Sequence, residues 1–119
     1  MGVLFEIAGE TVWEPGQKVA RLFLAQVRAL EEATGSPSGL SASFDDEIAI
    51  DVEKFEEFIA ATTSLIARSN SRALMALVRG PLRIMLALHE RHTDAPFPFT
   101  PDLQSAADRL DAGDQDSPL

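Results

Sequence analysis

Apolar residues dominate residues 71–92, and their spacing predicts a helix at the centre of the protein. One stripe at three- and four-residue intervals consists of Leu74, Leu77, Val78, Pro81, Met85 and Leu88. Met75, Leu82 and Leu86 extend the apolar surface almost all the way round, which is typical of a helix buried in a core or an interface. Because proline lacks an N–H and its ring collides with the carbonyl four residues earlier, we expect a kink or interruption near Gly80-Pro81.

Two other segments have the helical period. Residues 16–34 place Val19, Phe23, Val27 and Leu30 on one face, and Gly35 is suited to end the helix. Asp51 can cap a second helix over residues 52–68. The buried stripe expected for this helix is Val52, Phe55, Phe58, Ile59, Thr62, Leu65 and Ile66.

The strand signals are shorter. Residues 3–7 and 10–13 flank the turn Ala8-Gly9 and predict a hairpin, and residues 47–50 predict a third strand. Residues 35–46 are rich in Gly, Ser and Pro and predict a loop. The order ββ-α-β-α-α then predicts an α+β fold, with a small three-stranded, mainly antiparallel sheet packed by three helices.

The chain after His92 has a different composition. We expect residues 1–92 to form a single domain, onto which residues 93–113 pack as a proline-containing strap and a short C-terminal helix. Phe97 and Phe99 would anchor the strap. Residues 114–119, which are polar, are expected to be disordered.

Several stretches together resemble a known family. These are GETVWEP (9–15), VARLFLAQVRALEEATGSPSGL (19–40) and EIAID (47–51), followed by Phe55 and Phe58. They are similar to a family of small actinobacterial proteins of unknown function, DUF6086. The resemblance implies a bacterial, cytosolic protein and assigns no catalytic residue.

The net charge of −9 is unevenly distributed. Residues 1–67 hold twelve acids and four bases, whereas residues 68–92 hold five arginines and one glutamate. An acidic chain does not bind nucleic acid through bulk electrostatics, but it attracts basic proteins. No uncharged apolar run is long enough to span a membrane, and the absence of cysteine suits a cytoplasmic protein.

The arginines of the central helix are the first candidate site. Arg72, Arg79 and Arg83 fall on one side of the helix, and arginine is suited to bind a carboxylate or phosphate with two hydrogen bonds. The alternative is that these arginines pair internally with Glu53, Glu56 and Glu57 of the preceding helix.

Other candidates concern partners and metals. Trp13 is either a partner anchor or a cap on the core, and Asp45, Asp46 and Glu47 form either a partner-binding cluster or a solvated loop. His89 and His92 supply at most two metal ligands, with no third at a motif spacing. No motif indicates a cofactor or a catalytic centre.

Three functions remain open on the sequence alone. The first is a non-catalytic acidic binding protein, such as a bacterial immunity or antitoxin-like inhibitor of a basic partner protein. The second is a small-ligand protein or enzyme with an anion site at Arg79 and Arg83, and the third is a structural subunit of a larger assembly. We also expect a homodimer through Met75, Leu82 and Leu86, unless the strap and the short helix cover that side.

Overall fold

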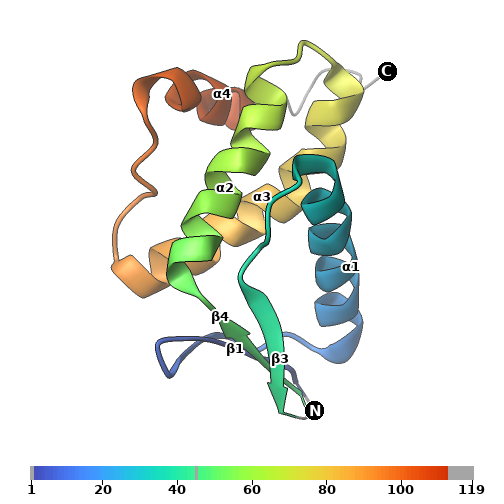
Figure 1. Cartoon of the computed structure of the whole chain (residues 1–119), viewed down its shortest axis with the longest axis vertical. Helices are drawn as coiled ribbons and strands as arrows, with labels where there is room; N and C mark the ends of the chain where they lie inside the picture. The colour runs from blue at the N-terminus through green and yellow to red at the C-terminus, as the bar shows by residue number, and fades with distance from the viewer. Residues whose placement is uncertain (1, 45, 113–119) are drawn as a thin grey trace.

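The structure is a computed structural model that describes residues 2–44 and 46–112. In this part of the chain a small sheet lies at one end and helices extend away from it (Figure 1). The elements are β1 (Leu4–Ile7), β2 (Glu10–Trp13), α1 (Gln17–Thr34), β3 (Leu40–Phe44), β4 (Glu47–Ile50), α2 (Val52–Ala67), α3 (Arg72–Thr93) and α4 (Pro101–Ala112).

The sheet is mixed, with strand order β2-β1-β4-β3. β1 and β4 run parallel at its centre, and each pairs with an antiparallel strand on its outer side. The predicted α+β class is confirmed, but the prediction of three strands is wrong because residues 40–44, expected in a loop, form β3. Ser41, Ala42 and Ser43 are exposed, so this edge strand is formed by backbone pairing with β4. Its sequence therefore lacks the alternation of apolar and polar residues that predicts a strand.

One glycine is required where β3 begins. Gly39 has φ +81°, and a Cβ at this position would lie 2.7 Å from the carbonyl oxygen of Asp51. The Gly39 carbonyl in turn accepts a hydrogen bond from Asp51 N at 2.9 Å. This close approach joins the start of β3 to the start of α2.

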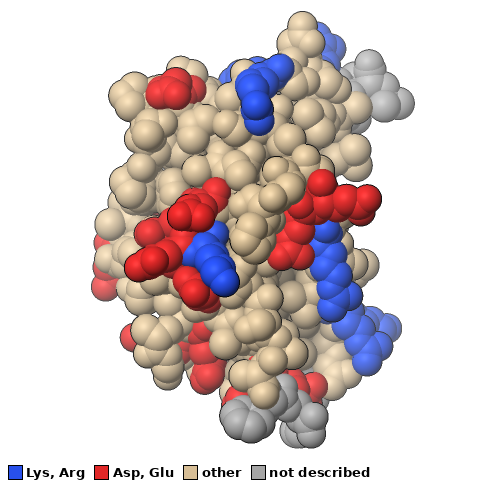
Figure 2. All heavy atoms as spheres, viewed as in Figure 1, with Lys and Arg blue, Asp and Glu red and all other residues tan. Residues whose placement is uncertain are grey.

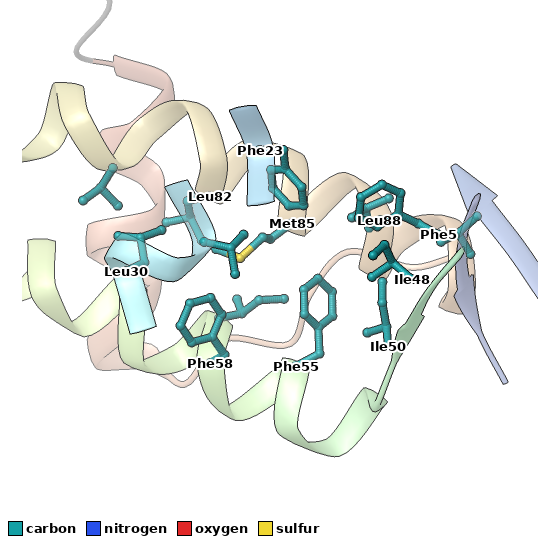
Figure 3. Packing of buried hydrophobic residues seen from close by; sticks show 14 of the residues in the cluster. Phe5, Phe23, Leu30, Ile48, Ile50, Phe55, Phe58, Leu82, Met85 and Leu88 are labelled. Atoms are coloured by element: carbon teal, nitrogen blue, oxygen red, sulfur yellow. The ribbon is translucent and has the colours of Figure 1, made fainter. Parts of the chain in front are cut away.

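The core lies between the sheet and the helices α1, α2 and α3. Figure 3 shows Phe23 of α1, Phe55 and Phe58 of α2, and Met85 of α3 directed toward one another. On α1 the stripe is slightly rotated from the prediction, because Ala20 is buried and Val19 is 49% exposed. Gly35 ends α1 in the left-handed conformation, and its N–H donates to Glu31 O, as expected of a glycine cap.

α3 is continuous through Pro81, so the helix is not interrupted there, and the kink expected near Gly80-Pro81 stays a prediction. Val78, Pro81, Met85 and Leu88 of the predicted stripe are buried as expected, but the buried side extends to Leu82, which has no exposed surface, and excludes Leu77, which is 76% exposed. The expectation that Leu82 faces outward is therefore wrong. Because α3 is apolar on most sides, its period alone does not indicate which side faces α2.

α4 packs mainly against α2, and together with the strap (residues 94–100) it lies beside Leu86 of α3. Ala106 and Leu110 of α4 are buried in the core cluster, and Phe97 and Phe99 pack against it. Met75 and Leu86 are partly buried against the same cluster. Residues 114–119, expected to be disordered, lie outside the described residues.

Candidate functional site

Four carboxylates line the start and outer side of α2, and we call them the acidic face: Asp51, Glu53, Glu56 and Glu57. Because Phe55, Phe58 and Ile59 point into the core, the helical period places the glutamates on the solvent side. Figure 2 shows acidic side chains gathered around basic side-chain atoms over the lower half of α2. Asp51 also caps the helix, since its Oδ1 accepts a hydrogen bond from Lys54 N at 3.2 Å.

One glutamate of the acidic face is connected to the core. His89 Nε2 lies 2.7 Å from Glu56 Oε2, and the side chains are 2% and 43% exposed. His89 Nδ1 has no hydrogen-bond partner among the described residues. Glu56 therefore pairs with the buried imidazole of His89. Glu53 and Glu57 are exposed and have no ion pair within the described part of the chain.

The α3 arginines contact α4. Arg79 Nε donates to Leu110 O at 2.9 Å, and an Arg83 nitrogen lies 3.9 Å from Asp111 Oδ1. Leu110 O is one of the last carbonyls of α4. The last carbonyls of a helix have no hydrogen-bond donor within that helix. These contacts attach α4 to α3 and differ from the pairing expected with Glu53, Glu56 and Glu57, because the arginine side of α3 faces α4. Arg72, at the start of α3, is exposed.

Two other arginines have similar roles that sequence reasoning missed. Arg109 of α4 donates to Ile66 O at 2.7 Å and to Ser69 O at 3.4 Å, at the C-terminal end of α2. Arg91 of α3 donates to Val12 O in β2 at 2.8 Å. The partners lie 40 or more residues away in the sequence. The only local indication in the sequence is the general preference of cationic side chains for the C-terminal ends of helices.

The remaining partner candidates are separated from one another. Trp13 is half-buried and packs against Phe5 and Phe23, with ring centroids 5.0 and 5.5 Å apart, so it caps the core. Asp46 is exposed with φ 59°, and Glu47 is half-buried at the start of β4. Asp45 lies outside the described residues.

No cluster of three or more His, Cys, Asp or Glu side chains suited to a metal occurs in residues 2–44 and 46–112. The pair of His89 and His92 therefore has no third ligand there, and His89 already contacts Glu56. Within the same residues, every helix is too short or too polar to cross a membrane.

The sequence alone indicates Glu53, Glu56 and Glu57 as partners for arginine and does not single out the acidic face as a site. The signal was nevertheless local. Once Phe55 and Phe58 are assigned to the core, a 3.6-residue period directs Glu53 and Glu57 outward.

Comparisons with known proteins identify a family without assigning an activity. No curated protein and no solved structure matches the chain. The match that does occur covers nearly the whole chain, including the acidic face, the strap and α4. The model of a family of unknown function, DUF6086, matches residues 1–114, and the chain therefore belongs to that family.

Proposed function

We propose that this protein is a non-catalytic binding protein that holds a basic partner protein through the acidic face of α2. A bacterial immunity or antitoxin-like inhibitor acting in the cytoplasm is the kind of protein that fits. The observation that carries the proposal is the outward direction of Glu53 and Glu57, which have no ion pair in the described part of the chain.

Electrostatics supports this surface over the arginines. A chain with a net charge of −9 attracts a basic protein from a distance, and a local concentration of carboxylates orients it on approach. The anion site proposed for Arg79 and Arg83 has less support, because both side chains make contacts with α4.

The test is co-purification with the products of the neighbouring genes, since inhibitors of this kind are encoded beside their targets. Binding at low salt that weakens at high salt is expected. The double variant Glu53→Lys/Glu57→Lys should no longer co-purify with the partner. The matched control, Glu10→Lys/Glu32→Lys, changes the net charge equally at exposed positions of β2 and α1, and it should retain the complex.

Two outcomes would overturn the proposal. One is that no neighbouring gene product forms a complex at low salt. The other is that both double variants weaken the complex equally, which would show dependence on net charge without a defined surface.

A role as a subunit of an assembly, including a homodimer, is a second proposal. It is supported by Leu77, which is 76% exposed beside the small exposed residues Ala76 and Gly80. Light scattering coupled to size exclusion tests it. A mass of 12.9 kDa at all micromolar concentrations would exclude the homodimer.

A further inference from the structure

A groove of about 380 Å³ lies between α3, the strap and α4. Its walls include Leu86, Glu90, Phe97, Phe99, Asp108 and Asp111. The volume falls near the lower end of the roughly 300–1,000 Å³ found for ligand sites. The groove therefore has room for one long side chain together with part of its backbone.

The charge around the groove favours a cation. Three carboxylates, from Glu90, Asp108 and Asp111, line it together with one guanidinium, that of Arg83. Arg83 lies 3.9 Å from Asp111, so part of its charge is already balanced. An anion would meet a net negative surface, which is the reverse of the anion site that the sequence left open at Arg79 and Arg83.

The apolar lining favours arginine among cationic groups. Leu86, Ala87 and Ala107 offer a surface for an aliphatic stem. Phe97 and Phe99 line the groove with ring centroids 4.7 Å apart. A guanidinium stacks on aromatic rings and forms two parallel hydrogen bonds with a carboxylate, whereas an ammonium group does neither as well.

Contacts within the protein hold the walls of the groove in position. Phe97 packs edge-on against the buried ring of His89, with centroids 4.9 Å apart. Thr93 Oγ1 accepts a hydrogen bond from Ala95 N at the start of the strap. Arg79 holds the end of α4 through Leu110 O. Binding therefore requires little ordering of the protein, which favours affinity.

We propose that this groove binds an arginine side chain presented by an extended segment of a partner protein. The stem lies along Leu86 and Ala107, and the guanidinium reaches Glu90 and Asp108. The site consists of different residues from the acidic face of α2, so it goes beyond the function proposed above and is tested independently of it.

The test uses the tripeptide acetyl-Gly-Arg-Gly-amide and amide chemical shifts of the full-length protein. Saturable shifts are expected at Leu86, Phe99 and Ala107. The same tripeptide with citrulline in place of arginine, which has the same shape without the charge, should bind about tenfold more weakly because charge-assisted hydrogen bonds are lost.

Matched variants locate the site. Glu90→Gln/Asp108→Asn should weaken binding of the arginine tripeptide about tenfold. Glu53→Gln/Glu57→Gln removes the same charge from α2 and should leave binding unchanged. Both variants alter exposed residues, so their spectra should show the native fold.

Any of three results would overturn the proposal: no saturable shift with the arginine tripeptide, equal binding of the citrulline tripeptide, or equal weakening by the two double variants. Inorganic phosphate binding in the groove in place of the tripeptide would contradict it as well. Because the tripeptide assay needs no natural partner, the groove proposal can fail while the acidic face still binds one, and the reverse also holds.

Discussion

The glutamates of α2 and the arginines of α3 and α4 are both clusters of like charge, but they have opposite orientations. Glu53 and Glu57 face solvent. Arg79, Arg91 and Arg109 donate to backbone carbonyls of other elements. A guanidinium can satisfy carbonyls at helix ends, whereas a carboxylate has no donor to offer them. The comparison indicates that Arg79, Arg91 and Arg109 stabilise the fold, whereas Glu53 and Glu57 are accessible from solvent.

The largest effect is expected when a carboxylate is placed in the core. Leu82→Glu buries a charge where Leu82 has no exposed surface, at an expected loss of more than about 4 kcal/mol in unfolding free energy. This loss is a large fraction of the total stability of a small domain, so most molecules of the variant are expected to be unfolded. Circular dichroism with urea titration measures the loss, and Leu82→Met, which conserves volume, should cost less than about 1.5 kcal/mol. A folded Leu82→Glu variant would contradict the buried position of Leu82.

The next effect concerns an arginine that contacts the backbone. Arg109→Ala removes the donors to Ile66 O and Ser69 O and should lower the unfolding free energy by about 2–3 kcal/mol. The control is Arg68→Ala, which removes the same charge from an exposed position and should cost less than about 0.5 kcal/mol. Equal losses in urea titrations of the two variants would refute the special role of Arg109.

A smaller effect separates neighbouring glutamates within the acidic face. Glu56→Ala leaves His89 Nε2 buried without its partner and should cost about 1–2 kcal/mol. Thermal unfolding compares it with Glu57→Ala, for which a minor change is expected because Glu57 is exposed. A loss from Glu56→Ala that is no larger than the loss from Glu57→Ala would contradict a stabilising contact with His89.

The smallest effect is expected from neutralising the outward glutamates. Glu53→Gln/Glu57→Gln should change the unfolding free energy by less than about 0.5 kcal/mol per residue, because exposed charges contribute little. Urea titration at low and high salt measures this. A loss of several kcal/mol would mean that these glutamates support the fold, contrary to their assignment as a binding surface.

Much of the helical structure could be predicted from local patterns. Gly35 ends α1 and Asp51 caps α2, as expected, because each effect depends on a few adjacent residues. The strand β3 could not be predicted, since Ser41 and Ser43 are exposed and only pairing with β4 makes the segment a strand.

Sites that depend on tertiary placement were harder to predict. α3 is apolar on most sides, so the period allowed either Leu77 or Leu82 to be buried, and packing against the other elements selected Leu82. The contact from Arg109 to Ile66 spans 43 residues of sequence, and no local pattern encodes it. Phe97 and Phe99 were identified as anchors, but the groove beside them depends on where α4 lies.

The central claim is that the acidic face guides a basic partner onto α2. The most direct test is the rate constant for association between this protein and the neighbouring gene product found by co-purification. Stopped flow measures it over a range of salt concentrations. At low salt, Glu53→Lys/Glu57→Lys should lower this rate constant by about tenfold or more relative to Glu10→Lys/Glu32→Lys, and the difference should shrink as salt screens the charges. Equal rate constants for the two variants at every salt concentration would contradict the claim.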